Sequence, residues 1–179
     1  MRPIAHLVVV AAVVSGCDGG AEVATPGTQL DDARCLEAPR LDAPVVELIE
    51  PAIAVTDAHY GSPQRYFEIS ADRQRVSLIV ATVDGEAEQV FFCAENRFGP
   101  PESLGPADGA TFGGDEVDID PDRVLSGIEE ELDDPDIVDF VVQGAPDGVI
   151  YDATIVSESG GVLLVLLGSN GDVLAVQAQ

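Results

Sequence analysis

The feature that most constrains the fold is a succession of short apolar runs separated by turns of hairpin length. The runs predicted as strands are residues 65–70, 75–83, 88–93, 137–143, 149–157, 162–167 and 173–177. Several gaps between them hold residue pairs typical of two-residue β-hairpins, and Asn170-Gly171 is the strongest of these signals. The sequence therefore predicts antiparallel strands that pair with their chain neighbours, three in a first group and four in a second.

A helix is predicted before each group of strands. Apolar residues of segment 44–60 fall on one helical face, and Gly61 should end this helix. Pro51 lies inside the segment and should kink the helix or split it. A second helix is predicted over 121–132, where Asp120 is a typical N-cap and a proline follows it. The predicted fold class is α+β, with two tandem halves that each pack one helix on a three- to four-stranded antiparallel sheet.

One predicted strand bears on how the two halves meet. Residues 162–167 read Val-Leu-Leu-Val-Leu-Leu, without the alternation of apolar and polar residues that a strand with one wet face shows. Both faces of this strand should therefore be covered. The helix at 121–132 can cover one face, and the other needs the first half, a second copy of the chain, or a partner.

The N-terminus indicates export. Arg2 precedes an apolar run over 4–14 that is too short to cross a hydrocarbon layer of about 30 Å. Ser15 and Gly16 lie directly before Cys17, and this segment closely resembles the lipobox of bacterial lipoprotein signal peptides. The resemblance implies that the Cys17 thiol is acylated and that Cys17 becomes the mature N-terminus. An ordinary secretory signal, or a buried apolar helix, is the alternative.

The patterns divide the chain into five segments. The predicted boundaries are 1–17 for the signal peptide, 18–40 for a flexible tether, 41–98 for the first helix-plus-sheet half, 99–116 for a linker loop and 117–179 for the second half. The tether is predicted from its glycines, its proline and its lack of an apolar period. The linker is predicted from the clustered prolines and glycines between 96 and 114.

Two further cysteines, Cys35 and Cys93, are predicted to form a disulfide bond. In an exported chain both face an oxidising compartment, where two spare thiols are more often bonded than free. The bond would close a loop of nearly sixty residues and join the end of the tether to the first sheet. A metal pair or a redox pair is the alternative, but the CxxC spacing is absent and His59 is the one histidine beyond the signal peptide.

The charge of the chain restricts its partners. The chain carries 33 Asp and Glu against 8 Arg and no Lys, which gives a formal net charge of -25. Apolar residues make up 46% of the sequence, too many for a disordered acidic tail, and so the chain should fold. A surface this negative repels phosphate groups, which excludes nucleic acid as a partner. The same charge steers basic partners toward the protein.

The C-terminal region resembles a known family. Residues 147–179 carry Asp-Gly before a strand containing Tyr151, then a Gly-Gly turn, an apolar strand, Asn-Gly-Asp and a last Val-Leu-Ala-Val strand. This order, with the helix at 122–132 before it, looks like the C-terminal half of a PepSY-like domain. The resemblance implies a small helix-plus-sheet module of an exported protein that inhibits proteases or contacts envelope proteins, without catalytic residues. The whole chain is similar to small lipoproteins of actinobacteria.

Motifs for catalysis are absent from the sequence. It has no GxSxG, HExxH, Walker or dinucleotide glycine pattern, and His59 is interpreted as a helix-end or surface group. The acidic segment 115–122 partly imitates a calcium loop, but Arg123 stands where that loop requires glycine. Acidic residues at a helix N-terminus are favourable with the helix dipole and need no ion. We therefore predict no catalytic residues, no metal and no cofactor.

Together these patterns predict a protein anchored by lipid at Cys17 on the extracytoplasmic face of a bacterial cell membrane. It would be a non-catalytic binding or inhibitory module that contacts another cell-envelope protein. The alternative is a carrier of a small ligand, lipid or cation in a cavity between helix and sheet. A core without a pocket would count against the carrier.

Overall fold

The computed structural model describes residues 35, 39–94, 97–157 and 160–179. Its helical elements are the 3₁₀ turn η1 (Val46–Leu48), α2 (Ile49–Tyr60), the 3₁₀ turn η2 (Gly114–Glu116) and α3 (Pro121–Glu131). Its strands are β1 (Arg65–Asp72), β2 (Arg75–Ala81), β3 (Glu86–Cys93), β4 (Arg97–Phe98), β5 (Glu102–Pro106), β6 (Phe112–Gly113), β7 (Asp136–Ala145), β8 (Gly148–Val156), β9 (Val162–Leu167) and β10 (Val173–Ala178). Within these described ranges no helix has the length and apolar character needed to span a membrane.

The first predicted helix is confirmed and begins before Pro51. Residues 46–48 form η1 and α2 starts at Ile49, so Pro51 lies in the first turn, where a missing N–H costs no helical hydrogen bond. Gly61 ends the helix in the left-handed conformation at φ 77°, as predicted from its position. The buried residues of α2 are Ile49, Ala52 and Thr56. This helix therefore presents a narrow stripe of small and branched side chains to the sheet.

Strands β1, β2 and β3 form the antiparallel meander that the sequence predicts. The β1–β2 turn is held by the Asp72 carboxylate, which accepts hydrogen bonds from the backbone N–H groups of Gln74 at 2.6 Å and Arg75 at 2.9 Å. This is the local bonding by which aspartate favours turns. Gly85 in the β2–β3 turn has φ 78°, a conformation that side chains with a Cβ rarely adopt.

The segment predicted as a linker loop, 99–116, instead adds strands to the sheet. Strand β5 pairs with β3, and β6 pairs with the beginning of β1. Phe112 of β6 is fully buried, with its ring centroid 6.0 Å from that of Tyr66. These strands are two to five residues long and lie among prolines and glycines, so they show no apolar period. They adopt the strand conformation because they pair with strands that are distant in the sequence. The linker prediction was therefore wrong for this stretch.

The described strands form one continuous sheet. Their order is β10-β9-β8-β7-β1-β2-β3-β4, and β5 and β6 pair with β3 and β1 outside this path. The two meanders join where β1 pairs antiparallel with β7, from Glu68 opposite Gln143 to Asp72 opposite Asp139. The α+β class with antiparallel strands is confirmed. Whether the two halves share a sheet was left open by the sequence, and the structure joins their strands in this single sheet.

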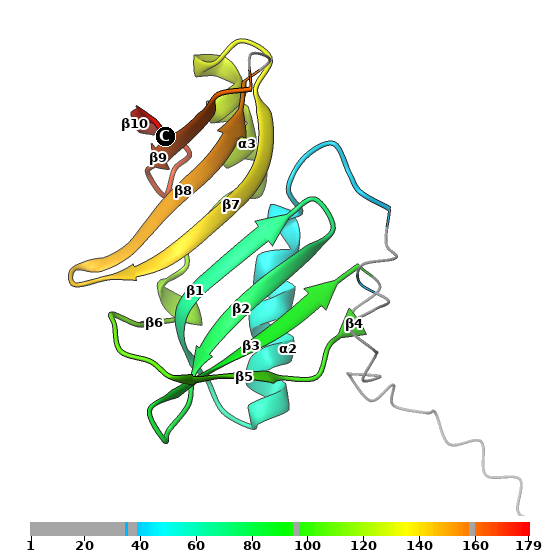
Figure 1. The fold of residues 1–179 in the computed structure, drawn as a ribbon, viewed down its shortest axis with the longest axis vertical. Helices are drawn as coiled ribbons and strands as arrows, with labels where there is room; N and C mark the ends of the chain where they lie inside the picture. The colour runs from blue at the N-terminus through cyan, green and yellow to red at the C-terminus, as the bar shows by residue number, and fades with distance from the viewer. Residues whose placement is uncertain (1–34, 36–38, 95–96, 158–159) are drawn as a thin grey trace, which may run out of the picture.

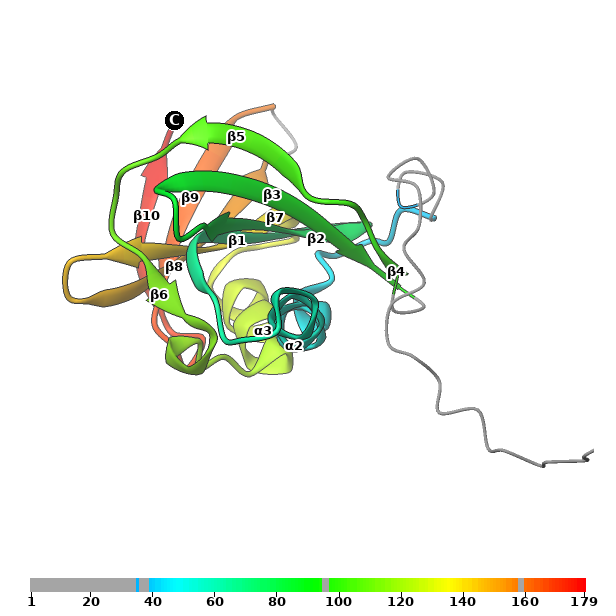
Figure 2. The same cartoon turned by 90° about the horizontal axis from the view of Figure 1, so that it is seen from below.

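Helices α2 and α3 both lie against the same face of the sheet (Figure 2). Alternate residues of the strands point toward them and form the core, among them Tyr66, Ile69, Leu78, Phe92, Phe140, Val142, Ala153 and Val165. From α3, Val124 and Ile128 are fully buried in the same cluster. The Asp120 side chain caps α3 by accepting a hydrogen bond from the Arg123 N–H at 3.3 Å, as predicted.

We call the opposite side of the sheet the open face, because neither α2 nor α3 lies over it (Figure 1). On its central strands it consists of Glu68, Ser70, Asp72, Asp139, Val141, Gln143, Ile150, Asp152 and Thr154. On β9 it continues through Val162, Leu164 and Leu166. Polar and apolar side chains alternate with core residues along each strand, as the two-residue period of a strand requires.

Strand β9 is covered on one face only within the described chain. Val165 and Leu167 are buried on the helix side, whereas Leu164 and Leu166 on the open face are half-buried and Val162 is 37% exposed. On the open face the strand is thus less completely covered than on the helix side. The predicted covers for this face, the first half, a second copy or a partner, stay predictions.

Candidate functional site

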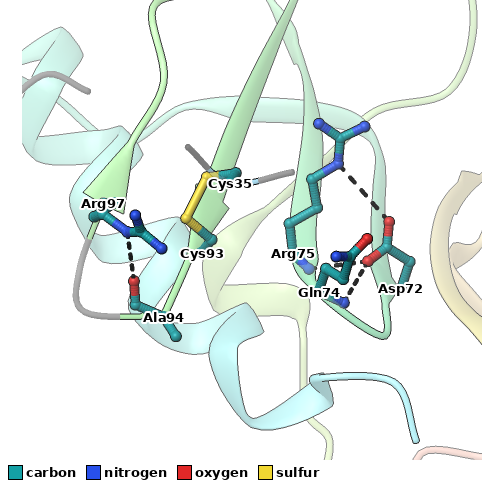
Figure 3. Close-up of a disulfide and its surroundings, with 7 residues drawn as sticks. All are labelled: Cys35, Asp72, Gln74, Arg75, Cys93, Ala94 and Arg97. Carbon is teal, nitrogen blue, oxygen red and sulfur yellow. Dashed lines mark hydrogen bonds and ion pairs between the residues drawn. A yellow bond between two sulfur atoms is a disulfide. The ribbon is translucent and has the colours of Figure 1, made fainter. Parts of the chain in front are cut away.

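The predicted lipid attachment residue, Cys17, lies outside the described residues. The predicted disulfide is present: Cys35 and Cys93 are bonded, with their Cα atoms 5.7 Å apart (Figure 3). Both cysteines are almost completely buried, at 2% and 0% exposure. The bond attaches the chain before α2 to the end of β3, beside Arg75 on the neighbouring strand.

His59 lies at the end of α2 and makes aromatic contacts. Its ring centroid is 4.9 Å from that of Phe98 and 5.1 Å from that of Tyr60. The C-terminal cap of the helix is provided by the Gly61 backbone instead. The position of His59 at the helix end is as predicted, and its visible role is packing against β4.

The acidic segment 115–122 is divided between η2 and the cap of α3. The Glu116 carboxylate accepts hydrogen bonds at 2.7 Å from the Gly113 backbone N–H and from Arg65. The Gly113 N–H, followed by Arg65, holds the pKa of Glu116 below its usual value. Across the described ranges no group of three or more His, Cys, Asp or Glu side chains is placed to hold a metal ion. This segment therefore serves capping and ion pairing in the fold.

The sheet instead gathers a group of carboxylates that sequence reasoning missed. Glu68 on β1, Asp139 on β7 and Asp152 on β8 all point to the open face, because each alternates with fully buried core residues on its strand. We call these three residues the carboxylate group. They lie on three adjacent strands of the sheet, whose pairing Figure 1 displays.

Asp152 is the most unusual member of the carboxylate group. It is only 7% exposed, and no hydrogen bond or ion pair to its carboxylate occurs among the described residues. Burial, followed by the negative charge of Glu68, raises the pKa of Asp152 to about 6. Buried polar side chains nearly always have a hydrogen-bond partner, so a buried carboxylate without one calls for an explanation.

The pKa values of Asp139 and Glu68 are raised as well. Burial raises the pKa of Asp139 to about 6, and the negative charges of Asp72, Glu68 and Asp152 add to the effect. A hydrogen bond from the Phe140 backbone offsets part of it. Burial also raises the pKa of Glu68 above its usual value. Three carboxyl groups that are each harder to ionise than usual therefore share one area of the open face.

Apolar side chains surround Asp152 on this face. Its cross-strand neighbours are Val141 on β7 and Leu166 on β9. Val141 is 7% exposed and Leu166 is half-buried. Directly opposed side chains in antiparallel strands have Cβ atoms about 5 Å apart. Asp152 thus lies between two aliphatic residues on the neighbouring strands, in a partly apolar setting.

The arginines of the sheet engage other groups. Arg73 forms an ion pair with Asp136 and donates to the Ile137 carbonyl at 2.8 Å. Arg75 lies 4.0 Å from the centre of the Phe91 ring and 3.8 Å from the Asp72 carboxylate. These contacts direct the two guanidinium groups to Asp136, Asp72, the Ile137 carbonyl and the Phe91 ring.

A small pocket lies at the end of α3. It has a volume of about 280 Å³ and is bordered by Leu132, Pro135, Ile155 and Leu163, with Asp133 and Asp134 at its polar side. Leu132 is the C-cap residue of α3, while Ile155 and Leu163 come from β8 and β9. The pocket therefore lies between the end of a helix and the sheet.

Comparisons with known proteins yield one structural likeness. The chain has a TM-score of 0.49 and 14% identity to the crystal structure described as "a putative lipoprotein" from Clostridium difficile 630, with 79% of this chain and 96% of that chain covered. A likeness of this size supports no conclusion about function. No family model and no curated protein matches the chain. The PepSY-like resemblance stays a prediction.

Proposed function

We propose that the protein is a non-catalytic binding module, anchored by lipid at Cys17 on the extracytoplasmic face of the cell membrane, that contacts a basic region of another envelope protein. The lipobox-like segment before Cys17 supports the anchor. The formal net charge of -25 supports a basic partner, because opposite charge accelerates encounter and selects partners.

The observation that carries this proposal is the open face. Neither α2 nor α3 lies over it, it contains the carboxylate group, and its leucines on β9 are partly exposed. Isolated exposed apolar residues are ordinary, but here aliphatic side chains adjoin a buried carboxylate, Asp152, that has no hydrogen-bond partner among the described residues, and this combination favours a recognition surface. A partner that covers this face would bury the leucines and supply positive charge.

The anchor limits where the partner can be. Cys17 and Cys35 are separated by eighteen residues, which span at most roughly 60 Å when fully extended. Because Cys35 is bonded to the sheet at Cys93, the folded part stays within that distance of the bilayer. The partner is therefore a membrane protein or another protein held close to the membrane.

Site-specific photo-crosslinking tests the proposal. A photoreactive amino acid placed at Ile150 or at Val162, both exposed on the open face, should capture the same envelope protein in intact cells. The same amino acid at Glu129, which is exposed on α3 on the opposite side, should not capture it. The captured protein is identified by mass spectrometry of the adduct.

Two outcomes would contradict the proposal. Equal capture from Ile150 and Glu129 would show that the open face has no special role, and capture of no protein from either open-face position would remove the partner. A Cys17→Ser variant adds a control for the anchor, because loss of acylation should release the protein from the membrane and lower the crosslinking yield.

The pocket at the end of α3 favours a second candidate function, that of a small-ligand carrier. Its volume of about 280 Å³ is near the lower end of the range of small-molecule sites. A Leu163→Trp variant should fill it and abolish binding of an apolar fluorescent dye, whereas Leu174→Trp on the exposed edge strand should leave dye binding unchanged. Equal dye binding by both variants and by the original protein would exclude the pocket as the site.

A further inference from the structure

We infer that Asp152, with Glu68 and Asp139, receives the guanidinium group of an arginine side chain of the partner protein. This inference rests on the proposed function and adds to it the chemistry that the open face recognises. The observation that carries the inference is an aspartate residue that is only 7% exposed, lacks a hydrogen-bond partner among the described residues, and is coupled electrostatically to two further acids.

The first step concerns the charge of Asp152. A buried carboxylate that lacks hydrogen bonds is costly to keep ionised, and like charges nearby add to the cost. Both conditions hold at Asp152, where burial and the charge of Glu68 act together. A cation that donates hydrogen bonds to this carboxylate removes both costs at once. Asp152 therefore gains more from such a ligand than an exposed aspartate would.

The second step concerns access. Asp152 is 7% exposed and lies between Val141 and Leu166, so a ligand has to bring its charge to the carboxylate on a slender stem. The methylene groups of an arginine side chain can pack against these two aliphatic side chains while its charged end reaches the acid. Burial of the remaining exposed surface of Leu166 by the stem adds a hydrophobic contribution.

The third step concerns the shape of the cation. Asp139 is coupled electrostatically to both Asp152 and Glu68, so more than one carboxylate lies within reach of a bound charge. Guanidinium is planar, carries five N–H donors and is more weakly hydrated than an ammonium group, which suits it to bridging several carboxylates in a partly apolar setting. A lysine ammonium offers a single compact charge and fits this arrangement less well.

The test uses ethylguanidinium chloride as the probe and the full-length protein in nonionic detergent. The ¹³C signals of the side-chain carboxyl groups are followed by NMR during titration at constant ionic strength, with ethylammonium chloride and calcium chloride in parallel titrations. We expect a saturable shift of the Asp152 and Asp139 signals with ethylguanidinium, at a lower concentration than with ethylammonium.

Variants separate specific binding from general charge effects. Asp152→Asn keeps the shape of the side chain and should weaken ethylguanidinium binding at the carboxylate group by about tenfold or more, the size of a lost charge-assisted hydrogen bond. Glu129→Gln on α3 changes the net charge equally and should leave the binding unchanged.

Three results would overturn the inference. These are a shift that never saturates and is shared by all exposed carboxylates, stronger binding of calcium than of ethylguanidinium at Asp152, and equal binding by the Asp152→Asn variant. These results are separable from the crosslinking experiment. If an envelope protein is captured but ethylguanidinium does not bind at Asp152, the proposed function stands and the arginine site is refuted. If ethylguanidinium binds at Asp152 but no envelope protein is captured, the proposed protein partner is refuted.

Discussion

Replacing both Cys35 and Cys93 by alanine should lower the free energy of unfolding by about 4 kcal/mol, the value that the chain-entropy relation gives for a closed loop of this length. The bond joins residues 58 positions apart and both sulfur atoms are buried, so its loss frees the unfolded chain while the folded core keeps its packing. The change is measured by urea unfolding of the Cys17→Ser protein, with and without the additional double substitution.

A second observable identifies the cause. If the disulfide acts mainly on the unfolded state, its removal exposes more surface on unfolding and should raise the urea m-value along with the loss of stability. Leu41→Ala, an exposed apolar residue in the same region of the chain, serves as the control and should change stability little. A loss below about 1 kcal/mol for the double variant would refute the stabilising role assigned to the bond.

Asp152→Asn should stabilise the protein by about 2 kcal/mol at pH 8 and by very little at pH 4. The pKa of Asp152 is raised from 3.8 to about 6 in the folded protein, chiefly by burial. A shift of one pKa unit corresponds to about 1.4 kcal/mol, which sets an upper value of roughly 3 kcal/mol, and the buried asparagine amide retains part of that cost. The free energy of unfolding is measured by urea titration across this pH range.

The direction of the pH dependence follows from proton binding. Between pH 4 and pH 6 the folded protein holds the Asp152 proton more tightly than the unfolded chain does, so the original protein loses stability as the pH rises through this range. Above pH 6 the loss is complete, and below pH 4 it is absent because the side chain is protonated in both states. The asparagine variant lacks this contribution, so the two stability curves should diverge as the pH rises.

A matched substitution isolates the effect of position. Glu129→Gln removes one negative charge from an exposed site on α3 and should shift the curve by no more than a few tenths of a kcal/mol at any pH. Asp152→Asn should also lower the pKa of Asp139, because the charge of Asp152 is among the causes that raise it. Asp152 would be shown not to ionise beside Asp139 by either of two results. One is a stability curve of Asp152→Asn that runs parallel to that of the original protein across the pH range, and the other is an unchanged pKa of Asp139 in this variant.

The elements that form through local interactions were predicted from the sequence. Interactions within a few residues form the N-cap of α3 at Asp120, the end of α2 at Gly61 and the hairpin turns. The local sequence around each of these features is therefore sufficient to locate it in the chain. The pairing of Cys35 with Cys93 also followed, because the chain offered no other pair once Cys17 was assigned to the anchor.

The short strands of segment 99–116 were missed for the opposite reason. Strand β6 has two residues, and it is a strand because Tyr66 and Phe112 meet across the sheet. Such pairing depends on contacts between positions far apart in the chain, which leave no period in the local sequence. The same limit applied to β7: its pairing with β1, which joins the two groups of strands in one sheet, left no signal in the sequence.

The carboxylate group shows most clearly which properties the sequence determined and which the tertiary structure decided. In the sequence, Asp152 is one acid among 33, lying in a mostly apolar strand, and its alternation with core residues indicates only that it points away from the helices. That Glu68 and Asp139 share this face with it was decided by the register between β1 and β7, which is fixed by packing in the core. The sequence determined the helices, the hairpins and the negative charge; the tertiary structure decided which charges lie together, because electrostatic coupling depends on distance in space.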